Sequence, residues 1–278
     1  MPGPDRRTTR SRGLRAAIAA AAVLVLAVLT MGTASAHGPG GPTQPKPTIV
    51  LVHGAFADAS SWSEVTERLQ HKGYTVYAPA NPLRGLAPDA DSLRAFLATI
   101  PGPIVLVGHS YGGAVVTNAA TGNAAIRSLV YVAGYALDEG ESIGAANALG
   151  GGTALLGQHI VVRPTTGAAP GDVDASIDPA YFRAVFAADL PAQQAAVLAA
   201  GQRPLLASAL GTPSGVPAWR TIPSWYVVAG RDRAIPPEAE RVMAHRAGSH
   251  TVELPTSHAA MLSRPDAVVR VILDATRS

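Results

Sequence analysis

The stretch Val105-Leu106-Val107-Gly108-His109-Ser110-Tyr111-Gly112-Gly113 decides the fold of this chain. A β-branched apolar run stops at a glycine, a serine follows two residues later, and two more glycines lead into an Ala/Val-rich helical pattern. This G-x-S-x-G arrangement is typical of a sharp strand-to-helix turn that raises one serine hydroxyl above the end of a sheet. The serine adopts a strained backbone there, and its neighbours two residues away need to be nearly free of side chain. The stretch predicts a nucleophilic Ser110.

The first 36 residues have the pattern of a secretory leader. Five arginines precede an apolar run of 14 residues, Ala16 to Leu29, and Ala34-Ser35-Ala36 offers a cleavage site of small residues. A membrane span needs about 20 residues, so this run is short for one. We predict a signal peptide over 1–36, cleaved after Ala36, with an uncleaved N-terminal anchor as the alternative. The Arg6-Arg7 pair leaves twin-arginine export open beside the general secretory route.

The leader also carries the positive charge of the chain. The whole chain has a net charge of +3 and the leader, with five arginines and one aspartate, has +4, so residues 37–278 are at about −1. A role with nucleic acid or stable association with an anionic membrane therefore loses its main support. The chain has no cysteine, so it has no disulfide and no residue for bacterial lipoprotein anchoring. Abundant Ala, Gly and Pro suggest a GC-rich bacterial source and, with the leader, a secreted or extracytoplasmic protein.

After a Gly/Pro-rich linker over 37–47, apolar strand-like runs alternate with helical patterns. The strand-like runs are Thr48–Val52, Tyr74–Ala78, Ile104–Val107, Ser128–Val132, Ser224–Val228 and His250–Leu254. The helical patterns are Ser60–Gln70, Ala90–Ile100, the segment after Ser110, Pro237–Ala247 and Pro265–Thr276. Continuous β-branched runs between helices predict a mostly parallel six-stranded sheet covered on both faces. We expect one α/β domain over 48–278.

Between about 137 and 222 this alternation stops. A segment of that length needs its own secondary structure. Tyr181–Phe186 and Pro191–Gly201 read as helices, and Pro191 suits a first helical turn. Because the insertion follows the fourth strand, at the edge where the serine points, we predict a helical cap over a pocket.

A serine hydroxyl needs a base to take its proton and a third group to orient that base. In chains with this turn the partners follow in the order Ser, Asp or Glu, then His. Asp232 comes just after one strand-like run and His258 just after the next. Because catalytic groups gather outside the carboxyl ends of parallel strands, we expect Ser110, Asp232 and His258 to converge.

Other interpretations of these residues stay open. Asp232 is also placed to cap the turn before Pro236-Pro237, and Asp138, after the fourth strand, is a rival acid. His258 also suits a capping or surface histidine. His109 lies inside the elbow and is expected to point away from the nucleophile.

Stabilising an oxyanion requires two preset N–H donors. The first expected donor is the backbone of Tyr111, the residue after the serine, and the second is Ala55 in the loop after the first strand. Phe56 follows as a candidate pocket residue. For His53 we prefer the interpretation of a loop histidine that hydrogen-bonds to backbone.

Four motifs carry a resemblance to a known family: Leu51-Val52-His53-Gly54-Ala55, the elbow Gly108–Gly113, the turn at Asp232, and Ser257-His258-Ala259-Ala260-Met261-Leu262-Ser263-Arg264-Pro265. Together they resemble the α/β-hydrolase superfamily, in particular the small branch that contains plant methyl-ester hydrolases and hydroxynitrile lyases. The resemblance covers nearly all of the mature chain except the cap. It implies the triad Ser110, Asp232 and His258, with Ala55 and Tyr111 as oxyanion donors.

The lyases typically carry a threonine where Gly54 stands and a lysine where Ala259 stands, so this chain departs from them at both places. Cofactor-free haloperoxidases share the same triad. We therefore expect an exported serine esterase that acts on small, partly apolar molecules without metal or cofactor. The alternatives are an amidase or lactonase, a haloperoxidase-type activity, or a noncatalytic binding protein of the same fold. The sequence does not indicate the oligomeric state.

Overall fold

The structure, a computed structural model, describes residues 45–278. The predicted signal peptide over 1–36 lies outside the described residues, as does the predicted linker except for its last three positions. Within the described part, no helix combines the length and apolar character needed to cross a membrane.

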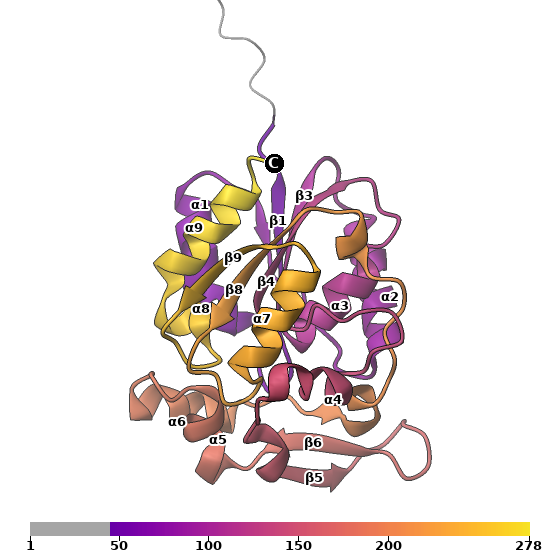
Figure 1. The fold of residues 1–278 in the computed structure, drawn as a ribbon, viewed down its shortest axis with the longest axis vertical. Helices are drawn as coiled ribbons and strands as arrows, with labels where there is room; N and C mark the ends of the chain where they lie inside the picture. The colour runs from indigo at the N-terminus through magenta and orange to yellow at the C-terminus, as the bar shows by residue number, and fades with distance from the viewer. Residues whose placement is uncertain (1–44) are drawn as a thin grey trace, which may run out of the picture. The chain divides into compact units, whose positions relative to one another are not determined.

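The centre of the described part is a six-stranded parallel sheet in the order β2-β1-β3-β4-β8-β9 (Figure 1). Its strands are β1 (Thr48–Val52), β2 (Val76–Tyr77), β3 (Ile104–Ser110), β4 (Ile126–Gly134), β8 (Ser224–Ala229) and β9 (His250–Leu254). The inner strands are continuous runs of β-branched and apolar residues because both of their faces are buried. The prediction of a parallel sheet covered on both faces is confirmed.

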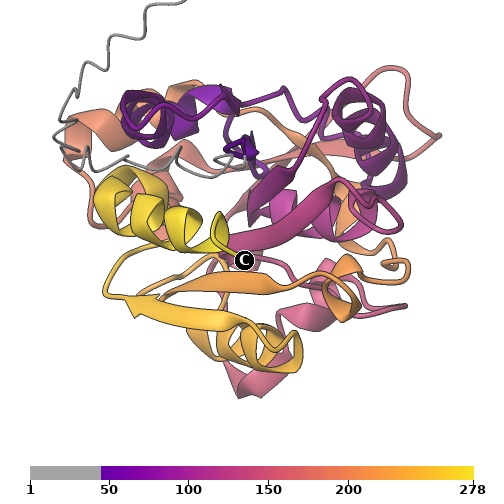
Figure 2. The ribbon, with the colours of Figure 1, turned by 90° about the horizontal axis from the view of Figure 1, so that it is seen from above.

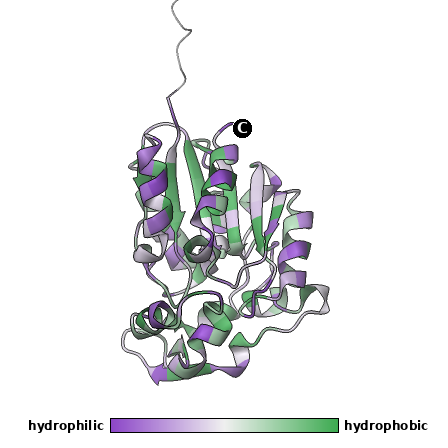
Figure 3. Cartoon of the chain, turned by 90° about the vertical axis from the view of Figure 1, so that its left-hand side faces the viewer, coloured by the Kyte–Doolittle hydropathy of each residue, from purple (hydrophilic) through white to green (hydrophobic). Residues whose placement is uncertain are grey.

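Helices lie on both sides of this sheet (Figure 2). One face packs against α1 (Ser63–His71), α8 (Ala260–Ser263) and α9 (Pro265–Ala275). The other face packs against α2 (Leu86–Leu97), α3 (Tyr111–Ala119) and α7 (Pro237–Arg246). Successive residues of a strand point to opposite faces, so Ile49 and Leu51 join the first layer while Val50 and Val52 join the second. Figure 3 shows the hydrophobic strands enclosed by helices with hydrophilic outer faces.

The segment between β4 and β8 forms the predicted insertion, at one end of the sheet (Figure 1). It contains α4 (Ile143–Ala146), β5 (Ile160–Pro164), β6 (Val173–Ile177), α5 (Pro179–Phe186), α6 (Ala192–Ala200) and β7 (Leu205–Leu206). The insertion also contains short 3₁₀ turns at Leu149–Gly151, Leu156–Gln158, Ala207–Leu210 and Ala218–Arg220, and a further 3₁₀ turn, Ala59–Trp62, precedes α1. Both expected cap helices are present.

The cap also holds a three-stranded antiparallel sheet in the order β5-β6-β7, which the sequence analysis did not anticipate. The insertion is therefore mixed in secondary structure rather than wholly helical. The β5–β6 pair is a hairpin, and β7 adds only two residues to its edge.

Candidate active site

The turn around Ser110 has the geometry that its sequence predicts. Ser110 ends β3 and precedes α3 with φ 52° and ψ −125°, a left-handed conformation that costs about 1–3 kcal/mol in a non-glycine residue. The flanking glycines permit close packing, because a Cβ on Gly108 would lie 2.6 Å from the carbonyl oxygen of Gly112. A Cβ on Gly112 would lie 2.5 Å from the carbonyl oxygen of Val52. The elbow therefore holds Ser110 rigidly, with 8% of its surface exposed.

Asp232 and His258 are brought together at the same end of the sheet. Asp232 follows β8 and His258 follows β9, and His258 Nδ1 donates to Asp232 Oδ2 at 2.5 Å. The other carboxylate oxygen of Asp232 accepts the backbone N–H groups of Ala234 (2.6 Å) and Ile235 (3.0 Å). These three bonds fix the plane of the carboxylate and leave Nε2 of His258 as the ring nitrogen that faces away from it. Both side chains are buried.

The rival acid Asp138 lies elsewhere. It forms a half-exposed ion pair with Arg220, with a nitrogen–oxygen distance of 2.7 Å. Asp232 also makes the turn-capping bonds that the sequence suggested as its alternative role, so a single side chain caps the turn and holds His258.

His109 lies beneath His258. Its Nε2–H donates to the backbone carbonyl of His258 (3.1 Å), and the two ring centroids are 4.6 Å apart. Complete burial, followed by the charge of His258, lowers the pKa of His109 well below its ordinary value. His109 is thus a neutral support that connects the elbow to the loop of His258.

The loop after β1 supplies the second expected oxyanion donor. The backbone amide of Phe56 donates to the carbonyl of Arg203 in the cap (3.0 Å). The candidate oxyanion donor is therefore the neighbouring amide, that of Ala55. His53 holds the loop through two hydrogen bonds. Its Nδ1–H donates to the carbonyl oxygen of Gly54 (2.9 Å), and its Nε2 accepts a hydrogen bond from the backbone N–H of Asn81 (2.9 Å). Burial lowers the pKa of His53. The preferred interpretation of His53 as a backbone-bonding loop residue matches these contacts.

Gly54 brings this loop against Ser110. A Cβ at this position would lie 2.7 Å from Cβ of Ser110 and 2.9 Å from the carbonyl oxygen of His109. A threonine there, as in the lyases, would require the loop or the elbow to move. The arrangement at this sheet end is a buried Asp–His pair and a strained serine beside a loop of backbone amides.

Comparison with known proteins gives the family. The model of the Alpha/beta hydrolase family matches residues 49–271, which is most of the chain. The chain belongs to the α/β-hydrolase family. It is similar to the alpha/beta hydrolase nvfD of Aspergillus novofumigatus, with 28% identity over 261 residues that cover 83% of this chain and 96% of that protein.

Solved structures share the fold of this α/β-hydrolase. Polyneuridine aldehyde esterase superposes with a TM-score of 0.71 and 21% identity, over 83% of this chain and 99% of that one. A methylesterase from Arabidopsis superposes with a TM-score of 0.68 and 19% identity, over 83% and 99%. The resemblance to the plant methyl-ester hydrolase branch is therefore confirmed at the level of fold.

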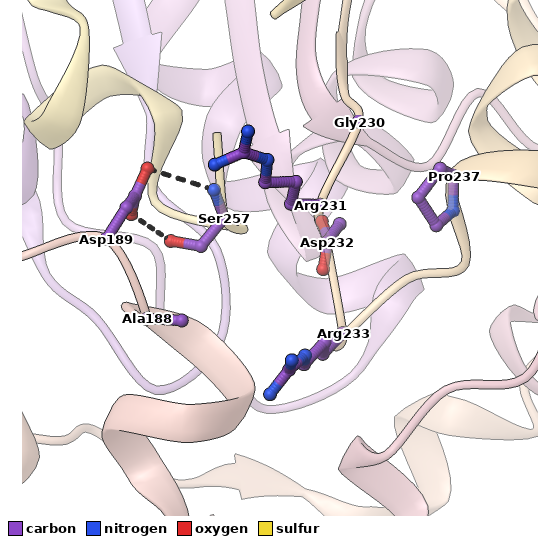
Figure 4. Close-up of a pocket in the computed structure, with 8 residues that line it drawn as sticks. All are labelled: Ala188, Asp189, Gly230, Arg231, Asp232, Arg233, Pro237 and Ser257. Carbon is purple, nitrogen blue, oxygen red and sulfur yellow. Dashed lines mark hydrogen bonds between the residues drawn. The ribbon is translucent and has the colours of Figure 1, made fainter. Parts of the chain in front are cut away.

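In this hydrolase the cap holds the loop of His258 from both sides. The carbonyl oxygen of Phe186, the last residue of α5, accepts a hydrogen bond from the backbone N–H of Ala259 (3.1 Å). Asp189 accepts the amide of Ser257 (3.0 Å) and also its hydroxyl, as the dashed lines in Figure 4 show. The ring of Phe186 stands edge-on to the ring of His258 with centroids 4.8 Å apart. The position of His258 thus depends on the cap as well as on the sheet.

Two cavities flank this arrangement. The first, of about 430 Å³, lies behind Asp232 and separates Ala188 and Asp189 of the cap from the loop of Arg231 and Arg233 (Figure 4). The second, of about 150 Å³, lies between the loop after β1 and the cap helices. Its lining includes Phe56, as the sequence suggested, together with Phe182, Phe186, Leu198 and Leu262.

Three supporting contacts were not identified from the sequence: His109 beneath His258, and Phe186 and Asp189 on the loop of His258. Phe186 was expected as an apolar residue of a cap helix, but not as a contact of His258. Glu240 of α7 also leaves a signal in the sequence, because it interrupts the apolar face of a helix whose other buried positions are Ala239, Met243 and Ala244. Among residues 45–278 no group of three His, Asp or Glu side chains is arranged to hold a metal ion.

Proposed function

We propose that this α/β-hydrolase is an exported serine esterase that cleaves carboxylic esters through an acyl-enzyme. The observation that carries the proposal is the bond from His258 to a buried Asp232 at the same end of the sheet as the strained Ser110. A histidine held in one tautomer by a carboxylate is the base that a serine nucleophile requires.

Each residue has a defined role in this mechanism. Ser110 Oγ attacks the ester carbonyl carbon while His258 Nε2 takes its proton, and Asp232 stabilises the resulting imidazolium. The amides of Ala55 and Tyr111 stabilise the charge on the carbonyl oxygen. His258 then protonates the leaving alkoxide, and a water molecule activated by the same ring hydrolyses the acyl-enzyme.

The substrate class is proposed to be small and partly apolar. Support comes from the aromatic lining of the 150 Å³ cavity. This lining includes Phe56, the residue after Ala55, and Phe186, whose ring contacts the ring of His258. This volume is below the range of about 300–1,000 Å³ that holds drug-sized ligands. Relatives of this fold named as esterases favour the same class.

The test is hydrolysis of p-nitrophenyl acetate, butyrate and octanoate by the purified chain from His37 onward. Ser110→Ala should lower kcat by at least about 10³-fold with an unchanged melting temperature. Ser128→Ala is the matched control, since Ser128 is a buried serine of β4 that bonds to Ala275. Wild-type turnover by Ser110→Ala would contradict the mechanism.

Amides, lactones and a fluorophosphonate probe separate the alternatives. Covalent labelling of Ser110 together with faster turnover of amides or lactones than of esters would replace the esterase with an amidase or lactonase. A folded protein that neither turns over any ester nor reacts with the probe would be a binding protein.

Export has its own test. The proposal rests on the arginines, the apolar run and the Ala34-Ser35-Ala36 site of the leader. Expression of the full chain in a bacterial host should release protein whose N-terminal sequence begins at His37. Recovery of the uncut chain in the membrane fraction would instead support the N-terminal anchor.

A further inference from the structure

A glutamate is buried within α7, close to the catalytic carboxylate. Glu240 is 0% exposed, and its Oε2 accepts the amide of Ala229 at 3.0 Å. Its other oxygen, Oε1, is buried and meets no N–H or O–H donor within residues 45–278. Burying an ionised carboxylate with one hydrogen bond and no cation is strongly unfavourable, so the protonation state of Glu240 needs a physical account.

The acidic neighbour of Glu240 is Asp232, whose charge acts on the Glu240 carboxyl. Both groups adjoin Ala229, whose amide donates to Glu240 Oε2 at 3.0 Å and whose carbonyl accepts a hydrogen bond from the Asp232 amide at 3.0 Å. Two ionised carboxylates are both acceptors, so they bond to each other only through a shared proton. Asp232 already accepts N–H groups from Ala234, Ile235 and His258, which stabilise its charged form. The proton of the pair therefore resides on Glu240.

The other polar groups around Glu240 are committed elsewhere. The hydroxyl of Tyr226 donates to the carbonyl of Gly134, and the hydroxyl of Tyr135 donates to Asn147 (2.9 Å). Arg241 lies near the surface and forms a bidentate pair with Glu253, at 2.8 and 2.9 Å. Burial and then the charge of Asp232 raise the pKa of Glu240 well above its ordinary value, against smaller opposing effects of the Ala229 amide and then of Arg241.

We propose that Glu240 is a positioning residue, whose protonated carboxyl donates a hydrogen bond to Asp232 and so fixes the acid that orients His258. The inference rests on the proposed function, since it assigns a role to a group behind the same triad. Glu240 touches no reacting atom and acts only through Asp232. Its bond draws negative charge away from the carboxylate oxygen that holds His258 Nδ1–H.

Glu240→Gln and Glu240→Leu test this role, with kcat/KM measured against pH. The glutamine keeps both bonds, since its oxygen accepts from Ala229 and its N–H₂ donates to Asp232. We expect its kcat to stay within about twofold of wild type and its acidic pH limb to stay unchanged. The leucine removes the donor, so kcat should fall about tenfold. The acidic limb should move to higher pH, because the full negative charge of Asp232 then faces the ring of His258.

Two outcomes would overturn the proposal. If Glu240 were ionised, Glu240→Gln would remove a negative charge near His258 and shift the acidic limb to lower pH. If Glu240 were only structural, Glu240→Leu would lower the melting temperature without moving the limb. Glu238→Gln is the matched control, because Glu238 lies exposed on the same helix.

Infrared difference spectroscopy tests the proton without any substrate and without requiring the leucine variant to fold. Wild type minus Glu240→Gln should show the carbonyl stretch of a protonated carboxylic acid at neutral pH. Its absence, with Ser110→Ala still inactive, would overturn the role of Glu240 while the esterase proposal stands. If the carbonyl band were present but Ser110→Ala were active, Glu240 would be protonated as proposed. The esterase proposal would then be contradicted, and with it the positioning role of Glu240.

Discussion

The sheet end and the cap are stabilised in different ways. Helix α9, which packs on the sheet, buries five of its eleven residues, whereas the nine-residue cap helix α6 buries only Ala195. Burial of apolar surface is the dominant source of folding free energy, so α9 contributes more to the sheet layers than α6 contributes to the cap, whose buried helix residues lie mainly on α5. The proposed catalytic groups end or follow strands of this sheet.

The cap also makes hydrogen bonds to loops at the sheet end. Its Arg203 carbonyl holds the Phe56 amide, and its Phe186 and Asp189 hold the loop of His258. Both contacts fall on loops that carry the proposed chemistry. The comparison teaches that the sheet sets the positions of the proposed catalytic groups, while the cap contacts their loops at two points.

The largest effect is expected from Asp232→Asn. An amide cannot hold the His258 Nδ1–H as a carboxylate does, so the ring takes the wrong tautomer and kcat should fall about 10³- to 10⁴-fold. Asp138→Asn, which removes the surface pair with Arg220, is the matched control and should change kcat less than about twofold. Hydrolysis of p-nitrophenyl butyrate measures both. A large loss in Asp138→Asn alone would move the acid role to Asp138.

A smaller effect is expected from Gly54→Ala. The new methyl group would lie 2.7 Å from Cβ of Ser110, so the loop must shift and displace the Ala55 amide. Misplacement by about 1 Å costs roughly 10²-fold in rate, which we expect to see in kcat. The cap control is Gly144→Ala, whose methyl group would meet only ordinary contacts, the nearest at 3.6 Å from the Leu210 carbonyl. Equal losses in the two variants would mean that the sheet end is no more tightly preset than the cap.

The sheet end was predictable because its sequence is locally decisive. The run from Val105 into Gly108 specifies a buried strand and a tight turn, and Asp232 and His258 each follow a strand of the same kind. Parallel strands place their carboxyl ends together, so three segments far apart in sequence converge without any knowledge of side-chain contacts. Prediction of the strands was weakest for β2, which has only two residues.

The cap sheet and the supporting contacts were not predictable in this way. Strand β7 is two residues long, and Val162 in β5 is 58% exposed, so neither has the buried alternating pattern that indicates a strand. Asp189 and Phe186 act through contacts with a loop some 70 residues later. For Glu240 the sequence indicates only that a charged residue lies on the apolar face of a helix. Its neighbour Asp232 is identified only by the packing of α7 against the sheet.

Buried histidines at the sheet end should make stability depend on pH. Burial lowers the pKa of His109, so the unfolded chain takes up its proton near pH 6.5 while the folded chain does not. The contribution of His109 to the free energy of unfolding is therefore fully present above pH 6.5. It decreases as the pH falls below 6.5, by up to about 1.4 kcal/mol per pH unit. Glu240, with its raised pKa, acts in the opposite sense, so the informative quantity is a difference between variants.

Urea unfolding of wild type and His109→Gln from pH 7.5 to 5 measures this difference. The free energy of unfolding of wild type minus that of the variant should decrease as the pH falls through this range. His159→Gln removes a histidine from the cap, where His159 stacks on Tyr181, and serves as the matched control. The same slope in both differences would contradict the assignment to the sheet end.

The smallest effect is expected from the cap clamp. Asp189→Ala removes the acceptor for the Ser257 amide and hydroxyl, so the loop of His258 loses one of its two cap contacts. Because Asp232 and the Ala259 bond still hold the loop, kcat should fall only about three- to tenfold.

The matched control separates a clamp on His258 from general support of the cap. Asp178→Ala removes the N-cap of α5, where Asp178 accepts the amide of Ala180 at 3.0 Å, and should cost about 1 kcal/mol of stability. If the cap acts on the site through the clamp, Asp178→Ala lowers the melting temperature but leaves kcat near wild type, whereas Asp189→Ala lowers kcat. Equal kcat for Asp189→Ala and wild type would show that the sheet alone positions His258, and the cap would then only enclose the pocket.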